Sequence, residues 1–316
     1  MKKIHKVFIG VALSILAIVL FGIYQFGPMF NLYLFPPSPQ KYAEIALAQM
    51  ELGINSDSQE WKDFQKEALK QVKNSKSYED NYDILAEAAK VAGGKHSFFV
   101  AADEIDHKVK DSDLPKIEKQ DDYLILTVPE VGAGDNDGIT QYANRLNDAL
   151  QKQDYKGVVI DLRDNFGGDM GPMISGLSSL IPDGDLITFD MSKSSDSVVK
   201  LAEGKVMGGG SPVTLSHPGK VKPVPVAILM NEETASSAEI TILAFKGLDN
   251  VRTFGKPTAS YTSVNSTFDQ YDKALLAITM GYLIDREGNK YENVPLQPDV
   301  ETEDALNEAL EWMKDQ

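Results

Sequence analysis

From Tyr123 onward the chain alternates short apolar runs with segments of helical periodicity, and this alternation limits the fold more than any other sequence feature. The pattern predicts strands at 123–128, 158–162, 186–189, 224–230, 251–254, 263–269 and 274–283, and helices at 137–151, after 171, after 236 and after 302. We place Thr302 at the N-cap of the last helix. Alternation of strands and helices along the chain is typical of an α/β core, which we expect over 95–316. The Ser-, Gly- and Lys-rich segment 191–222 is expected to be a loop or a cap.

Residues 1–30 are interpreted as a cytoplasmic leader and a transmembrane anchor. The stretch Val7 to Tyr24 is apolar apart from Ser14 and two glycines, and three lysines precede it. A helix of this length can span a bilayer, and the lysines favour a cytoplasmic N-terminus, with the rest of the chain outside the cell. A cleaved signal peptide is the alternative. Because no small-x-small cleavage pattern precedes Pro28, we favour an uncleaved single-pass anchor.

Residues 31–94 are predicted to form a small helical bundle. A proline-rich spacer leads into three amphipathic segments, which begin at Ser38, near Ser56 and near Tyr78, and the third ends at Gly93. Between Ser97 and Leu124 the chain is too short for a further independent domain.

The composition limits the partners and the chemistry. The formal net charge is -16, and removal of the three leader lysines makes the remainder still more acidic. Such a surface repels nucleic acid and attracts cationic ligands. Cysteine is absent, which excludes disulfides and a thiol nucleophile, and neither a metal site nor a cofactor motif is evident. No feature of the sequence indicates an oligomeric state.

The segment Thr234-Ala235-Ser236-Ser237-Ala238-Glu239 lies where an apolar strand turns into a helix. A hydroxyl at this point faces unpaired N–H groups and the positive end of the helix dipole, which suits a nucleophile. The same residues also spell a capping box, in which Ser236 is the N-cap and Glu239 stands at N3. Both interpretations remain open on these residues alone.

Two further motifs precede this segment. An Asp-Leu-Arg strand closes on Asn165-Phe166-Gly167-Gly168, where paired glycines can direct backbone N–H groups towards a ligand. A serine nucleophile also needs a base, and His96, in Gly93-Gly94-Lys95-His96-Ser97, is the best placed histidine. The other three are less suitable: His5 in the leader, His107 in a charged run and His217 in a Pro/Gly loop.

These three motifs, in this order, resemble the tail-specific (C-terminal processing) serine protease family. The resemblance implies a ClpP/crotonase-like protease core, Ser236 as nucleophile and His96 as base. For the oxyanion hole we consider the backbone N–H of Ser237 together with Gly167 or Gly168. Glu239 and Glu292 are candidates to orient the imidazole, although a structural role suits each of them as well.

The chain departs from the usual pattern of that family in two respects. There is no room for a PDZ domain, and Tyr261 stands where the better-known members carry a lysine base, which leaves Lys256 as the only nearby lysine. Together with the anchor and the short helical bundle, these two features make the chain resemble the lantibiotic-degrading branch of the tail-specific protease family.

That resemblance implies a membrane-anchored serine peptidase that cleaves the C-terminal tail of nisin or a related lantibiotic and so confers resistance. Such a cationic peptide substrate agrees with the acidic chain. The alternatives are a general extracytoplasmic tail-specific peptidase, and a non-catalytic protein that binds cationic peptides on a degenerate protease fold.

Overall fold

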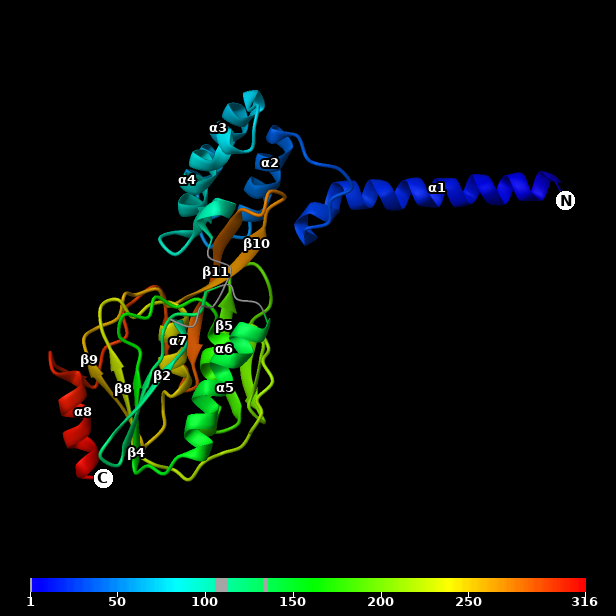
Figure 1. The fold of residues 1–316 in the computed structure, drawn as a ribbon. Coiled ribbons are helices and arrows are strands. Elements are labelled where there is room, and N and C mark those ends of the chain that lie inside the picture. Colours follow the sequence, from blue (N-terminus) through cyan, green and yellow to red (C-terminus); the bar gives the residue numbers. More distant parts are fainter. Residues whose placement is uncertain (1, 106–112, 133–135) are drawn as a thin grey trace. The chain divides into compact units, whose positions relative to one another are not determined.

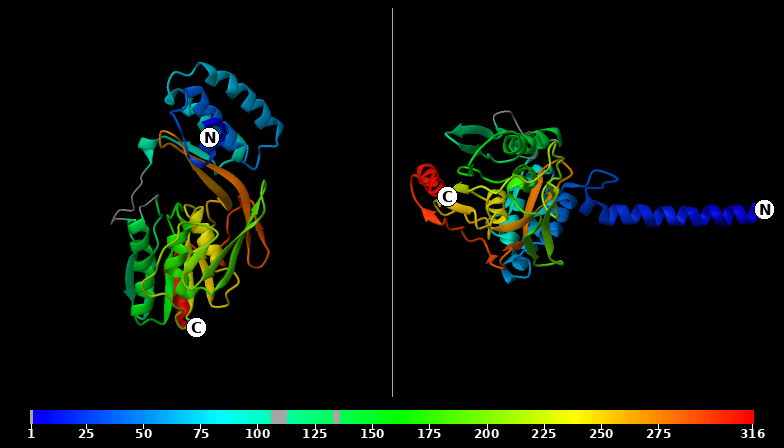
Figure 2. Two further views of the ribbon diagram at one scale, coloured as in Figure 1. Left: turned by 90° about the vertical axis from the view of Figure 1, so that its right-hand side faces the viewer. Right: turned by 90° about the horizontal axis from the view of Figure 1, so that it is seen from below.

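The computed structural model describes residues 2–105, 113–132 and 136–316, and the chain forms two compact units. Unit 1 holds the chain up to residue 105 together with 265–280, and unit 2 holds the remainder. The chain enters unit 1 along β10 (Ser263–Asp269) and returns to unit 2 along β11 (Leu275–Asp285), its pairing partner (Figure 2). Unit 1 is thus larger than the bundle expected at 31–94, because a distant hairpin belongs to it.

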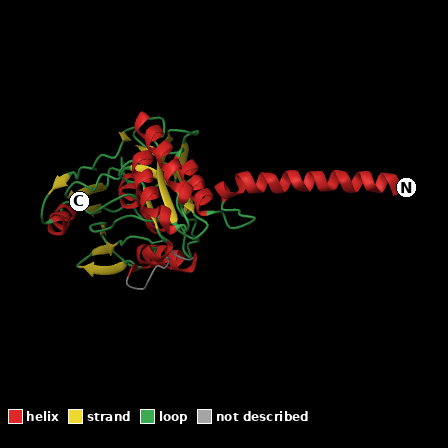
Figure 3. Ribbon diagram, turned by 90° about the horizontal axis from the view of Figure 1, so that it is seen from above, coloured by secondary structure: helices red, strands yellow, loops and turns green. Residues whose placement is uncertain are grey.

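The first element of unit 1 is α1 (Lys2–Phe26), one uninterrupted helix (Figure 3). Its segment Phe8–Phe26 is the one helix in the described part of the chain that is long and apolar enough to cross a membrane. The side chain of Phe8 is 71% exposed, and most large apolar residues after it on α1 are exposed too. Exposure of this much apolar surface is costly in water, so α1 is suited to an apolar environment.

Three further helices pack around the unit 1 part of β11. The remaining elements of unit 1 are α2 (Pro39–Met50), α3 (Gln59–Gln71), α4 (Tyr82–Gly93), β1 (Phe98–Val100) and the 3₁₀ turns η1 (Gly27–Phe30), η2 (Val72–Asn74), η3 (Glu79–Asn81) and η4 (Ala102–Glu104). α2 begins beside Ser38 as predicted, and Ser38 caps it, since its Oγ accepts the N–H of Lys41 at 3.2 Å. The apolar stripes of the helices bury Trp61 and Leu85 in one core with Leu276 of β11.

Unit 2 is built on a six-stranded sheet in the order β13-β9-β8-β4-β3-β2 (Figure 1). Its strands are β2 (Lys116–Gln120), β3 (Tyr123–Thr127), β4 (Gly157–Asp161), β8 (Val226–Met230), β9 (Val251–Gly255) and β13 (Val300–Glu301), all parallel except the edge strand β2. Parallel strands point their carboxyl ends to one edge, where loops from β4 and β8 meet.

Helices cover both faces of this sheet. Val158 and Ile160 of β4 join the main core with α5 (Asn136–Lys152), α6 (Met170–Leu177) and α7 (Ser237–Ala244). The intervening Val159 faces α8 (Ala305–Lys314) on the other side. This burial on both faces confirms the α/β core and explains why the strands are continuously apolar.

The segment 191–222 contains regular structure that the sequence analysis missed. After β5 (Gly184–Met191), the strands β6 (Ser197–Ala202) and β7 (Lys205–Met207) form an antiparallel hairpin on β5. Val199 and Leu201 alternate with exposed or half-buried residues and enter the main core. β5 also pairs with the unit 2 part of β11, which pairs in turn with β12 (Lys290–Tyr291). The 3₁₀ turn η6 (Ser178–Leu180) follows α6.

The start of the last helix corrects another expectation. α8 begins at Ala305 with Asp304, not Thr302, at the N-cap. The hydroxyl of Thr302 accepts the N–H of Asp304 at 3.1 Å, so Thr302 stabilises the turn before the helix.

Candidate active site

Ser236 occupies a sharp turn between β8 and α7 in unit 2. Its backbone has φ 54° and ψ -116°, a conformation that L-residues with a side chain rarely adopt. Two neighbours fix the turn: the N–H of Ala235 donates to the carbonyl of Asn165 at 2.9 Å, and Thr234 Oγ1 donates to the carbonyl of Leu162 at 2.9 Å. A strained residue held between a strand and a helix is also the geometry of the nucleophile elbow of hydrolases.

Glu239 holds this turn from inside the protein. Its side chain is fully buried, and one carboxylate oxygen accepts the N–H of Ser236 at 2.8 Å. The Ser236 side chain accepts the N–H of Glu239 in return, so the predicted capping box is confirmed. The carboxylate also accepts N–H groups of Ser260 at 3.1 Å and Tyr261 at 2.9 Å, and the hydroxyl of Thr258. Burial raises the pKa of the Glu239 carboxyl, whereas these hydrogen bonds lower it. Glu239 therefore ties the elbow to the loop 258–261.

The loop with the paired glycines lies directly against the elbow. Gly167 and Gly168 have φ of 104° and 91°. A Cβ added at Gly167 would lie 2.8 Å from the Cβ of Ser236 and 3.0 Å from the N of Ser237, so a side chain does not fit there. The Oγ of Ser237 donates to the carbonyl of Gly168 at 2.5 Å. Segments about 70 residues apart in sequence thus form one site.

The two glycines differ in their N–H groups. The N–H of Gly167 donates to Asn165 Oδ1 at 2.8 Å and is therefore engaged. Gly168 forms a parallel bridge with Val131. The carbonyl of Gly167 accepts the N–H of Val131, and the N–H of Asp169 donates to the carbonyl of Val131. The N–H of Gly168 itself consequently points the other way, and Ser237 is the first residue of α7, where an N–H has no intrahelical acceptor. In the ranges that the structure describes, neither of these two N–H groups has a hydrogen-bond acceptor.

The sequence analysis missed two residues that shape this site. Asn165 is fully buried and uses its Nδ2 to donate to the carbonyl of Val128 at 2.8 Å, which anchors the glycine loop to the end of β3. Thr258 joins Glu239 to the loop that precedes β13. The only sequence signal for Asn165 was its place beside the paired glycines. Thr258 ends the stretch Gly255-Lys256-Pro257-Thr258, which resembles the Gly-x-Pro-Thr pattern of the tail-specific proteases, but no local pattern indicates its distant partners Glu239 and Leu296.

His96 belongs to unit 1, in the turn between α4 and β1. Its carbonyl accepts Nδ2 of Asn265 at 2.6 Å, and the neighbouring Ser97 Oγ accepts the N–H of Thr279 at 2.9 Å, so the turn is held by the β10–β11 hairpin. The side chain is 9% exposed. Burial, aided by the charge of Lys95, lowers the pKa of the imidazole to about 4. The ring is therefore neutral at pH 7, as a general base must be.

The remaining candidates lie in ordinary surface contacts. Lys256 forms ion pairs with Glu303 at 2.8 Å and Glu232 at 3.9 Å, and the hydrogen bond to Glu303 raises the pKa of its ammonium group. A lysine held in the charged form is a poor base, which argues against Lys256 in that role. Glu292 is exposed and pairs with Lys290 at 2.6 Å.

His217 and His107 are not part of this site as the structure describes it. His217 is exposed, with Nδ1 2.9 Å from Asp148 Oδ1, whereas His107 lies outside the described residues. In the described ranges, no three His, Cys, Asp or Glu side chains gather in an arrangement that holds a metal ion. Ser236, Ser237, the paired glycines and Glu239 are thus the predicted residues that the fold of unit 2 brings together.

Comparison with known proteins agrees with this arrangement. Residues 122–302, which include the elbow and the glycine loop, match peptidase family S41. The Nisin-resistance protein of Lactococcus lactis subsp. lactis is 42% identical over 318 residues, which cover 100% of this chain and 99% of that protein. The carboxy-terminal processing protease CtpA of Bacillus subtilis (strain 168) is 26% identical over 157 residues, covering 49% of this chain and 30% of CtpA.

Solved structures show the same fold. A lipoprotein from Streptococcus agalactiae superimposes with a TM-score of 0.81 at 36% identity, over 90% of this chain and 99% of the lipoprotein. The photosystem II D1 C-terminal processing protease superimposes with a TM-score of 0.54 at 14% identity, over 84% of this chain and 94% of that protease. At this low identity the second likeness concerns the fold alone.

Proposed function

Since the chain belongs to peptidase family S41, we propose that it is a membrane-anchored serine peptidase that removes the C-terminal tail of nisin or a related lantibiotic and so confers resistance. The observation that carries this proposal is the elbow at Ser236, a strained residue beside the N–H groups of Gly168 and Ser237, which have no acceptor among the described residues. A capping box alone does not require a positive φ at its first residue, because N-cap residues ordinarily adopt extended backbone angles.

In the proposed mechanism, the neutral imidazole of His96 takes the proton of Ser236 as Oγ attacks the carbonyl carbon of the scissile peptide bond. The oxygen of the tetrahedral intermediate accepts hydrogen bonds from the N–H groups of Gly168 and Ser237. Loss of one such donor typically costs about 10²–10³ in kcat, so the pair supports much of the rate. The imidazolium then gives its proton to the leaving amine, and water hydrolyses the resulting acyl-enzyme in the reverse sequence of proton transfers.

Glu239 takes a different part in this proposal from the one expected for an orienting carboxylate. Its oxygens accept hydrogen bonds from the elbow and from the loop 258–261, so it positions Ser236 through the backbone. The enzyme then works as a Ser/His dyad, with Glu239 as a positioning residue, and the exposed Glu292 has no part in the reaction.

The proposed substrate is supported by the similarity to the Nisin-resistance protein and by the negative net charge of the chain, and the proposed location by the apolar helix α1. The name of the Lactococcus protein connects it with nisin, and that protein matches this chain over its full length. The strongly acidic chain attracts a cationic peptide. With α1 as an uncleaved anchor, the N-terminus lies in the cytoplasm and the peptidase faces the outside, where such a peptide attacks the membrane.

Mass spectrometry of nisin incubated with the full chain tests this function. We expect loss of a C-terminal fragment, and no cleavage by Ser236→Ala or His96→Ala. Unrelated peptides with free C-termini provide the comparison, because the similarity to CtpA favours a general tail-specific peptidase as the second candidate. Equal cleavage of those peptides would favour the general peptidase. Intact nisin that nonetheless binds would favour a non-catalytic protein.

A further inference from the structure

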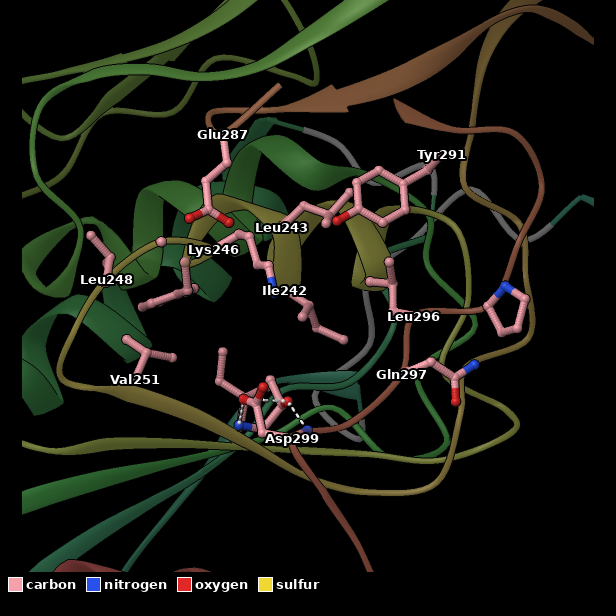
Figure 4. A pocket seen from close by; sticks show the side chains of 15 residues that line it. Ile242, Leu243, Lys246, Leu248, Val251, Glu287, Tyr291, Leu296, Gln297 and Asp299 are labelled. Carbon is pink, nitrogen blue, oxygen red and sulfur yellow. Dashed lines mark hydrogen bonds between the residues drawn. The ribbon is translucent and has the colours of Figure 1, made fainter. Parts of the chain in front are cut away.

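A cavity of unit 2 lies at the carboxyl end of α7, the helix that carries Ser236 at its amino end (Figure 4). Its volume is about 430 Å³, within the size range of small-molecule sites. The apolar part of its wall comes from α7, β8, β9, the loop between α7 and β9 and the loop before β13, and includes Ile228, Ile242, Leu243, Leu248, Val251 and Leu296. An apolar side chain of a ligand would be buried here.

Three charged residues line this cavity: Lys246, Glu287 and Asp299. Figure 4 shows the ammonium group of Lys246 directed into the hollow and the carboxylate of Glu287 at its margin. Neither group forms a salt bridge or a side-chain hydrogen bond with any residue in the described ranges. Asp299, by contrast, is engaged, since its Oδ2 accepts the N–H of Thr253 at 2.8 Å and the hydroxyl of Thr253 at 2.9 Å. The cavity thus offers one cation and one anion to a ligand.

A short path of hydrogen bonds joins this cavity to the elbow. Leu296, in the cavity wall, donates its N–H to Thr258 Oγ1 at 2.9 Å and accepts the N–H of Thr258 at 3.1 Å. The hydroxyl of Thr258 donates to Glu239, which accepts the N–H of Ser236. Thr258 and Glu239 are both buried, so this path is shielded from water. Movement of Leu296 would therefore alter, through Thr258 and Glu239, the hydrogen bond that holds the backbone N–H of Ser236.

We propose that this cavity is a regulatory site for a short apolar peptide with free ends. Its apolar side chains occupy the wall around Leu243 and Leu296, its carboxylate pairs with Lys246 and its ammonium group pairs with Glu287. Occupation moves Leu296 and changes the hydrogen bonds that hold Ser236. Each cleavage by a peptidase creates a new carboxylate and a new ammonium group, the two charges that this site would pair, so we assign the site to sensing of product ends, a role that rests on the proposed function. Binding itself does not depend on that function.

Calorimetric titration of the full chain in detergent micelles with leucyl-leucine tests the binding. We expect saturable binding of one dipeptide per chain. N-acetyl-leucyl-leucine amide, which lacks both charges, and glycylglycine, which lacks apolar side chains, should each bind at least tenfold more weakly. Lys246→Gln and Glu287→Gln should each weaken leucyl-leucine at least fivefold, whereas the exposed Lys222→Gln should leave it unchanged. Absence of saturable binding, or unchanged affinity in Lys246→Gln, would overturn the site.

Hydrogen exchange of segment 234–262 tests the coupling without any need for catalysis. Bound leucyl-leucine should change the exchange rates of the amides of Ser236, Ser260 and Tyr261 at least twofold. Thr258→Val removes the hydroxyl between Leu296 and Glu239 and should abolish this change while dipeptide still binds. Thr258→Ser, which keeps the hydroxyl, should preserve it. Binding without a change in exchange in the wild-type chain, or loss of the change in Thr258→Ser, would overturn the coupling and leave the peptidase proposal standing.

Discussion

The main-chain N–H of Ser236 donates a hydrogen bond of 2.8 Å to the buried carboxylate of Glu239. This bond holds the backbone of the elbow in a conformation that it would otherwise avoid. The side chain of Ser236 completes the capping box by accepting the backbone N–H of Glu239. A hydroxyl that accepts one hydrogen bond keeps its proton and a second lone pair for chemistry. A capping residue and a nucleophile are therefore compatible at one position.

Replacement of Glu239 should impair both folding and catalysis. Glu239→Gln keeps the volume but loses the charge and places an NH₂ group beside backbone donors, so we expect a loss of about 2–4 kcal/mol in the free energy of unfolding. Because the elbow relaxes, kcat should fall more than KM rises. Urea unfolding and steady-state kinetics measure the two effects. Glu292→Gln is the control and should change neither; a Glu239→Gln enzyme with normal kcat would contradict the positioning role.

The two adjacent serines should respond differently to alanine. Ser237→Ala removes the hydroxyl bond to the carbonyl of Gly168 but keeps the backbone N–H of residue 237. We expect a loss of about 1 kcal/mol in stability and at most a tenfold loss of kcat. Ser236→Ala should abolish peptide cleavage while the unfolding midpoint stays close to that of the wild type. The opposite ranking of the two variants would move the nucleophile to Ser237.

A side chain at Gly167 should disrupt the oxyanion hole. The added methyl group of Gly167→Ala meets Ser236 Cβ and the carbonyl of Ala235, both at 2.8 Å, and displaces the loop that aims the N–H of Gly168. We expect kcat to fall by about 10²–10³. Gly184→Ala is the matched control, since Gly184 also has a positive φ of 137° but nothing within 4 Å of an added Cβ. Equal losses of kcat in both variants would point to backbone strain alone.

The acid limit of activity should lie unusually low. The lowered pKa of His96, about 4, keeps the folded imidazole neutral far below the ordinary histidine value of about 6.5. A plot of kcat/KM against pH should therefore hold its level to about pH 5 and fall below pH 4. Between pH 6.5 and 4 the unfolded chain binds a proton that the folded chain does not, so stability should decrease as the pH falls through this range. His96→Gln should remove this contribution, and an acid limit near 6.5 would contradict the burial of the ring.

The sequence was sufficient to predict the elements that depend on local patterns. The buried run before Ser236 and the helix after it form as expected, and Ser38 caps its helix. Long-range pairing was not predictable. Phe98 pairs antiparallel with Ala277, in the part of the β10–β11 hairpin (265–280) that belongs to unit 1, and no local pattern signals such a partner.

Of the candidate site, too, the sequence could predict the parts that follow from local patterns and not those that depend on long-range contacts. The motifs predicted Ser236, Ser237 and the glycine loop as candidates, because a strand end and a helix start have recognisable signatures, and the fold brings these residues together. Sequence alone left open which glycine offers a free N–H. That distinction depends on Asn165 Oδ1, which engages Gly167, and on the bridge to Val131, which turns Gly168 outward.

The central claim is that His96 activates the hydroxyl of Ser236, and the rate of its labelling by a serine-reactive fluorophosphonate tests this most directly. Intact-mass and peptide-mass spectrometry of the full chain should locate one label on Ser236. His96→Ala should label at least 10³-fold more slowly because the base is absent, although its unfolding midpoint shows a folded chain. Labelling of His96→Ala at the wild-type rate, or a label on Ser237, would contradict the claim.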